Sequence, residues 1–185
     1  MVTTAAKEIR KNKILVVDDV AVNVQLLTTY LTSVGYNVIA ARDGQEALEK
    51  VVACNPDLIL LDVMMPKFNG FEVCERIKAD ESTRIVPVIM VTALNEIEDK
   101  IKATEAGADD FVSKPFNKLE LLTRVKSLLR IKELHDQLNT KVKELEEAQP
   151  RLRQLANTDL LHGLFNHRYF KQHRQQELYR ATRHQ

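Results

Sequence analysis

The chain has 185 residues, of which 44% are hydrophobic and 29% are charged, and its formal net charge is +1 at pH 7. This length predicts one globular core of about 100–150 residues with an additional segment, and the near-neutral charge argues against a protein built around nucleic acid. The two cysteines lack the spacing of metal ligands, and the sequence contains neither a signal peptide nor an apolar run long enough to span a membrane. We therefore expect a cytoplasmic protein with reduced thiols.

After a polar leader, residues 1–12, strand-like and helix-like patterns alternate five times along the chain. Near-continuous aliphatic runs predict strands that are buried on both faces, and the amphipathic runs between them have the lengths of helices. Five such units predict an α/β fold with a doubly wound, five-stranded parallel sheet. The expected strands are residues 13–17, 37–41, 57–61, 87–91 and 110–113, and the expected helices are residues 21–34, 44–54, 70–79, 95–106 and 117–130.

Polar residues follow four of these strands. Asp18 and Asp19 come after the first strand, Asp62 after the third, Thr92 after the fourth and Lys114 after the fifth. Because chemistry gathers at the carboxyl ends of parallel strands, we expect these side chains to lie together. Taken singly, each aspartate is equally well explained as a helix N-cap. Thr92 alone is more often a capping residue than a ligand contact, and Lys114 alone would be solvated surface. Taken together, they predict a site that holds a divalent cation beside a phosphoryl group.

Magnesium suits this set of groups because it prefers octahedral oxygen ligation and retains several waters. We expect Asp19 and Asp62 to be direct metal ligands. Asp18 should act through a bound water, and the backbone carbonyl of Met64 should complete the protein's share of the ligands. Such an ion removes the charge repulsion that makes a carboxylate a poor nucleophile toward phosphorus.

Two further groups are expected to bind the phosphoryl oxygens. Lys114 would neutralise one oxygen as a point charge, and Thr92 would donate its hydroxyl to another. Lys114 also precedes Pro115, so the bond between them is a candidate for a cis peptide, which would re-aim the backbone and point the ammonium group inward.

Four motifs surround these residues: ILVVDD (14–19), LILLDVMMPKFNG (58–70), VTA (91–93) and SKPF (113–116). In their order and spacing, residues 13–130 resemble the receiver domain of two-component response regulators, which has a flavodoxin-like fold. The resemblance implies that Asp62 is the phosphoacceptor of a phosphorelay and receives its phosphoryl group from a histidine kinase or a phosphotransfer protein, with Mg²⁺ as the cofactor.

The same resemblance implies a switch that reports phosphorylation. Thr92 should move toward the phosphoryl group, and Phe111 should turn into the space that is vacated. The alternative is that Phe111 is an ordinary core residue. Asn69 stands where many members of the family have Asp, and we expect this difference to matter little.

Residues 131–156 carry a heptad pattern that is interrupted only by Lys141. We favour a parallel coiled coil that dimerises the protein, and the alternative is a single helix laid back on the domain. Pro150 predicts a break or a kink near Gln149 and Pro150, because a proline inside a helix removes a hydrogen bond. The apolar positions of the repeat are Ile131, Leu134, Leu138, Leu145, Ala148, Leu152 and Leu155.

Residues 157–185 carry a second family pattern, whose matching residues are Thr158, Asp159, Leu161, Gly163, Leu164, Asn166, Arg168 and Phe170. With these residues the segment resembles the opening of a GGDEF domain, the diguanylate cyclase domain that makes cyclic di-GMP. His162 and His167 depart from the family pattern, and the GGDEF signature itself is not in the sequence. The resemblance therefore implies no cyclase activity and no GTP binding for this chain, with Asn166 as a vestigial nucleotide-binding position.

The sequence thus leaves two functions open. In the first, phosphorylation controls dimerisation, and in a full-length parent it controls a diguanylate cyclase. In the second, the chain is a stand-alone receiver that binds a partner protein or acts as a phosphate sink. A transcription factor would need a DNA-binding domain that the sequence does not supply, so neither DNA nor a membrane is an expected partner.

Overall fold

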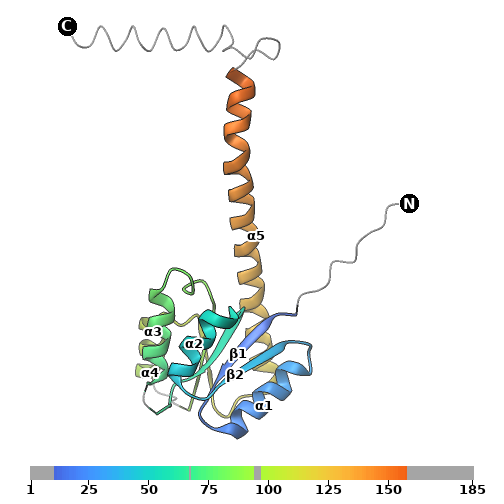
Figure 1. The fold of residues 1–185 in the computed structure, drawn as a ribbon. Helices are drawn as coiled ribbons and strands as arrows, with labels where there is room; N and C mark the ends of the chain where they lie inside the picture. The colour runs from blue at the N-terminus through green and yellow to red at the C-terminus, as the bar shows by residue number, and fades with distance from the viewer. Residues whose placement is uncertain (1–10, 67, 94–96, 158–185) are drawn as a thin grey trace, which may run out of the picture. The chain divides into compact units, whose positions relative to one another are not determined.

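The structure, a computed structural model, describes residues 11–66, 68–93 and 97–157. The chain divides into two units, Met1–Leu134 and His135–Gln185. The first unit holds the whole sheet and the candidate site, and the expected GGDEF-like segment lies outside the described residues except for Asn157. Figure 1 shows the sheet of the first unit with helices on both of its faces.

The strands and helices alternate as the sequence predicts, and β3 and β4 each begin one residue later than expected and include Asp62 and Thr92. The strands are β1 (Lys13–Val17), β2 (Asn37–Ala41), β3 (Leu58–Asp62), β4 (Val88–Thr92) and β5 (Asp110–Ser113). The helices are α1 (Ala21–Thr32), α2 (Gly44–Cys54), α3 (Gly70–Ala79), α4 (Ile97–Glu105) and α5 (Lys118–Asn157).

All five strands are parallel, in the order β2-β1-β3-β4-β5. The chain leaves β1 toward β2 on one side and later returns to place β3 on the other side. The strand order therefore reverses between β1 and β3, and this reversal opens the crevice in which doubly wound folds place their sites. The predicted fold is confirmed.

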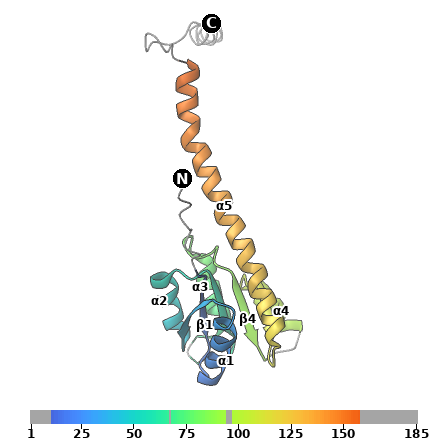
Figure 2. The ribbon, with the colours of Figure 1, turned by 90° about the vertical axis from the view of Figure 1, so that its right-hand side faces the viewer.

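The two faces of the sheet are covered by different helices, and the buried residues alternate between them. Along β1, Leu15 and Val17 pack beneath α2, α3 and α4, whereas Ile14 and Val16 pack beneath α1 and α5. Figure 2 shows the protein from the side of the sheet that α1 and α5 cover. Burial on both faces explains why these strands are nearly all aliphatic.

The helix α1 ends two residues before its expected end, at Thr32. Gly35 has a φ of 95°. Its N–H donates to the carbonyl of Thr32, and the N–H of Tyr36 donates to the carbonyl of Leu31. This pair of bonds is a Schellman-type ending, in which the left-handed glycine satisfies the last carbonyls of the helix.

The helix α5 contains Pro150 and is not interrupted there. A proline removes one hydrogen bond but leaves the remaining ladder able to continue with a bend, so a kink at Pro150 stays a prediction while the expected break is absent. The apolar side chains of Leu138 and Leu145 are exposed, and the coiled coil also stays a prediction. No described helix has the length and apolar character needed to cross a membrane.

Leu121→Ala should lower the free energy of unfolding by about 2–5 kcal/mol, because Leu121 is fully buried between α5 and the sheet. Urea unfolding followed by circular dichroism measures the change. Leu119→Ala is the matched control on the same helix, where the side chain is 74% exposed, and its effect should be well under 1 kcal/mol. Equal losses in the two variants would contradict this packing of α5.

Candidate functional site

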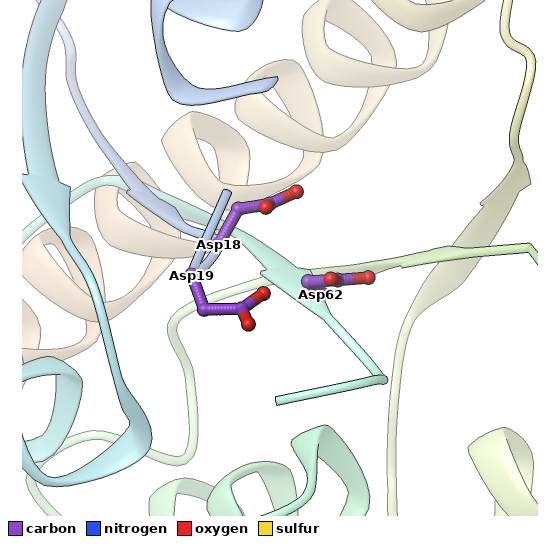
Figure 3. A group of neighbouring side chains, drawn as sticks. All are labelled: Asp18, Asp19 and Asp62. Carbon is purple, nitrogen blue, oxygen red and sulfur yellow. The ribbon is translucent and has the colours of Figure 1, made fainter. Parts of the chain in front are cut away.

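The predicted site residues lie at one edge of the sheet. Asp18 and Asp19 follow β1, Asp62 and Thr92 are the last residues of β3 and β4, and Lys114 follows β5. Figure 3 shows the carboxylates of the three aspartates gathered beyond the ends of β1 and β3. One oxygen from each can be chosen so that all three lie within 4.8 Å of one another.

Asp18 is the most deeply buried of the acidic groups, with a relative exposure of 1%. Its Oδ1 accepts a hydrogen bond from the backbone N–H of Val20 at 2.9 Å. The side-chain amide of Asn23 in α1 donates to both carboxylate oxygens, at 3.1 and 2.9 Å. A buried carboxylate needs such donors because it has left water, and here they hold Asp18 in one orientation.

Lys114 connects the ends of β1, β3 and β5. Its Nζ lies 2.9 Å from Oδ2 of Asp18 and 3.1 Å from Oδ1 of Asp62. Burial alone lowers the pKa of the Lys114 ammonium, but its bonds to the two carboxylates together outweigh burial and raise that pKa above the ordinary value. The lysine is therefore charged at neutral pH. The Lys114–Pro115 bond, which the sequence marks as a candidate, is cis.

Asp62 is buried as well, with an exposure of 5%. Burial raises the pKa of its carboxyl, and the charge of Asp18 adds a smaller rise. Hydrogen bonds from Lys114 and from the backbone N–H of Met64 oppose that rise. The net direction is upward, which means that the folded protein holds this carboxylate at an electrostatic cost.

The two residues of the expected switch occupy neighbouring strands. Thr92 is buried at the end of β4, and its backbone carbonyl accepts a 2.6 Å hydrogen bond from the N–H of Lys114. Phe111 in β5 is half-buried and packs against the core beneath α2, α3 and α4. This packing suits both roles that the sequence leaves open for Phe111, so its part in a switch stays a prediction.

The loop after β3 is held close to the site by Gly70, the first residue of α3. Its N–H donates to the carbonyl of Val63 at 2.9 Å, and a Cβ at this position would lie 2.8 Å from the Cα of Val63. Only glycine permits this approach of two backbones. Asn69 is the N-cap of α3 and accepts from the N–H of Glu72 at 2.9 Å, a role for which Asn and Asp are about equally good.

The donor set fits a hard divalent cation. Magnesium binds through one or two carboxylates together with oxygens from water or backbone, and Asp18, Asp19 and Asp62 offer carboxylates at the required proximity. Asp19 is exposed and makes no hydrogen bond or ion pair within the described part of the chain. A cation at this edge would be held by groups that already carry excess negative charge.

Sequence reasoning did not identify Asn23 or Gly70 as parts of the site. Asn23 lies in the first turn of α1, where helix side chains tilt toward the N-terminus, so its position five residues after Asp18 was an available signal. The role of Gly70 depends on the approach of α3 to the loop after β3, which no local pattern reveals.

Comparison with known proteins places these features in a family context. The sequence matches the response regulator receiver domain family over residues 14–126. Response regulator PleD of Caulobacter vibrioides (strain NA1000 / CB15N) is 48% identical over 126 residues, which are 68% of this chain and 28% of PleD. The DNA-binding dual master transcriptional regulator RpaA of Synechocystis sp. (strain ATCC 27184 / PCC 6803 / Kazusa) is 46% identical over 118 residues, which are 64% of this chain and 49% of RpaA.

Solved structures agree with this match. The chemotaxis protein CheY4 of Vibrio cholerae is 33% identical with a TM-score of 0.61, covering 64% of this chain and 98% of that one. The receiver domain of the Francisella response regulator 1452 is 34% identical with a TM-score of 0.61, covering 65% of this chain and 98% of that one. The similarity therefore concerns the sheet-containing part of the chain, which spans half or less of PleD and RpaA.

Asp62→Asn should raise the free energy of unfolding at neutral pH in the absence of divalent cations. Because the pKa of Asp62 is raised in the folded state, the stability that this group contributes is complete below its unfolded pKa and is lost as pH rises through its folded pKa. The advantage of the variant should therefore shrink as the pH is lowered to about 4, near the unfolded pKa of Asp. Urea unfolding at several pH values measures this difference.

Asp19→Asn is the control for this measurement, since it removes an exposed carboxylate from the same cluster. Its effect on the free energy of unfolding at pH 7 should be smaller, because an exposed carboxylate keeps its contact with water. A destabilised Asp62→Asn protein at pH 7 would show that the bond to Lys114 outweighs the cost of burying Asp62.

Proposed function

The chain belongs to the response regulator receiver domain family, and on this premise we propose that Asp62 accepts a phosphoryl group from a phosphohistidine of a histidine kinase or phosphotransfer protein, in a reaction that depends on Mg²⁺. The observation that carries the proposal is the arrangement of Asp62 itself. It is a buried carboxylate at the end of β3, bridged by Lys114 to Asp18 and close to the carboxylate of Asp19.

In the proposed step, a carboxylate oxygen of Asp62 forms a bond to phosphorus while the bond between phosphorus and the donor's imidazole nitrogen breaks. The electron pair of the broken bond returns to the imidazole, and Asp62 becomes an acyl phosphate. Bound Mg²⁺ would supply charge neutralisation for the phosphoryl oxygens. Asp18, Asp19, Asp62 and the carbonyl of Met64 are the groups that would hold it.

Lys114 has a different task before and after the transfer. Before it, the ammonium neutralises Asp18 and Asp62 across the gap between β1 and β3. When Asp62 is acylated, the same charge is available to a phosphoryl oxygen without a large movement of the side chain. Thr92, one strand further along, is the proposed hydroxyl donor to a second oxygen and, with Phe111, the proposed switch.

The proposed output of the switch is a change in dimerisation through α5. Exposed apolar side chains follow the heptad repeat from the end of the sheet-containing unit onward, including Ile131, Leu134, Leu138 and Leu145. An exposed apolar seam of this kind is typical of a helix that pairs with another helix. In a longer protein, the GGDEF-like residues 157–185 would place a diguanylate cyclase under the control of this pairing.

Acetyl phosphate and Mg²⁺ should transfer one phosphoryl group to the wild-type chain, and Asp62→Asn should abolish the transfer. Intact-protein mass spectrometry and a phosphate-affinity gel measure the incorporation. Asp80→Asn is the matched control, because Asp80 is an exposed aspartate at the end of α3, and it should label at the wild-type rate. Labelling of Asp62→Asn at the wild-type rate would refute the assignment of the phosphoacceptor.

Beryllium fluoride with Mg²⁺, which together mimic the phosphoryl group, should shift the chain from monomer to dimer in light scattering on a sizing column. Leu138→Glu should prevent the shift by placing a charge in the apolar seam, whereas Asn139→Glu places the same charge beside the seam and should dimerise normally. Both positions are exposed in the single chain, so neither substitution disturbs a packed core.

Two other results would support different functions. A wild-type chain that stays monomeric in both conditions would favour a stand-alone receiver, which binds a partner protein or acts as a phosphate sink. A dimer in both conditions would mean that α5 associates constitutively and that phosphorylation only rearranges an existing pair.

A further inference from the structure

Asn23 makes contacts that the proposed phosphoryl transfer does not by itself require. It is the third residue of α1, and its side-chain amide nitrogen lies 3.1 Å from Oδ1 and 2.9 Å from Oδ2 of Asp18. Because helix side chains tilt toward the N-terminus, this position in the first turn reaches back to the end of β1. Asn23 therefore contacts the carboxylate that precedes its own helix.

These contacts complete the hydrogen bonding of Asp18. An ionised carboxylate offers about four lone-pair directions. The N–H of Val20 and the amide of Asn23 approach Oδ1, and the amide of Asn23 and the ammonium of Lys114 approach Oδ2. Asp18 is thus already surrounded by donors, and a metal ion can bind it directly only by displacing one of them.

The neighbouring carboxylates accept fewer hydrogen bonds from the described residues than Asp18 does. Asp19 is exposed and has no hydrogen bond or ion pair within the described residues, and Asp62 has Lys114 on Oδ1 and the N–H of Met64 as donors. Of the donors around Asp18, the backbone N–H of Val20 is anchored by the chain, and the side-chain amide of Asn23 is the neutral group that a substitution can remove.

The number of carboxylates that bind directly bears on which ion is preferred. Magnesium keeps several waters and needs few protein oxygens, whereas Ca²⁺ takes 6–8 oxygen ligands, often with additional carboxylates. A site that offers two direct carboxylates therefore favours Mg²⁺, and a third direct carboxylate would improve the site for Ca²⁺ more than for Mg²⁺.

We propose that Asn23 is a positioning residue that keeps Asp18 from binding the cation directly and thereby gives the site its preference for Mg²⁺ over Ca²⁺. The proposal rests on the proposed function, because it concerns the cation site beside Asp62. In this proposal, an uncharged side chain outside the acidic cluster selects the ion that the cluster binds.

The experiment measures the affinities of Mg²⁺ and Ca²⁺ for the full 185-residue chain by isothermal titration calorimetry. Asn23→Ala and Asn23→Leu both remove the amide, and the second keeps its approximate volume. In both variants the affinity for Ca²⁺ relative to Mg²⁺ should rise about tenfold, the lower end of the effects seen for residues that orient metal ligands. Gln25→Ala, an exposed change on the same helix, should leave the ratio unchanged.

Water-proton relaxation with Mn²⁺ gives a second readout that a purely structural role would not move. Wild type should retain about three exchangeable waters on the ion, the remainder of an octahedral shell with three protein ligands. Both Asn23 variants should retain fewer, because Asp18 has entered the shell.

The outcomes separate this inference from the proposed function. An unchanged ratio in both Asn23 variants, or an equal loss of affinity for the two ions, would overturn the role of Asn23 while labelling of wild-type Asp62 still supported the proposed function. A wild-type chain that bound no Mg²⁺ and did not label would overturn both.

Discussion

The ammonium of Lys114 between two buried carboxylates is the interaction on which the site depends. Asp18 and Asp62 are at most 5% exposed, and each would be costly as an isolated buried charge. Lys114 lies within 3.1 Å of both, and the loss of Lys114, which would leave both buried carboxylates without their counter-charge, would cost about 3–5 kcal/mol. The carboxyl ends of β1, β3 and β5 are thereby held together by charge, above a core that is held together by apolar burial.

The bridge leaves an excess of negative charge among the described groups of the site. Among the described residues, three carboxylates gather where one ammonium is present, and the pKa of Asp62 stays raised in spite of its bond to Lys114. A second cation would relieve this excess charge, and a phosphoryl group would bring new negative charge to the same ammonium. The folded state therefore carries an electrostatic cost at Asp62, the proposed phosphoacceptor, which is a common trade between stability and function.

Much of the fold could be predicted because its strands are buried on both faces. In β1 and β3 nearly every side chain belongs to one of two cores, so the aliphatic runs mark the strands to within one residue. The ends of the helices were harder to predict from the sequence. The end of α1 is decided by the Schellman-type hydrogen bonds around Gly35. Whether α5 continues past Pro150 is decided by the backbone hydrogen bonds of the helix, which tolerate one missing donor.

The sequence by itself determined which polar residues stand at the carboxyl ends of the strands. It therefore also determined that they share one edge of the sheet: Asp18, Asp19, Asp62, Thr92 and Lys114. That much follows because parallel strands carry their carboxyl ends to the same side. Only the tertiary structure decided how those groups are paired. The contact from Asn23 to Asp18 depends on the tilt of a helix side chain, the bridge of Lys114 joins residues 96 positions apart, and the need for Gly70 arises where α3 touches the backbone after β3. Distances of this kind are set by the packing of whole elements, which no local pattern in the sequence encodes.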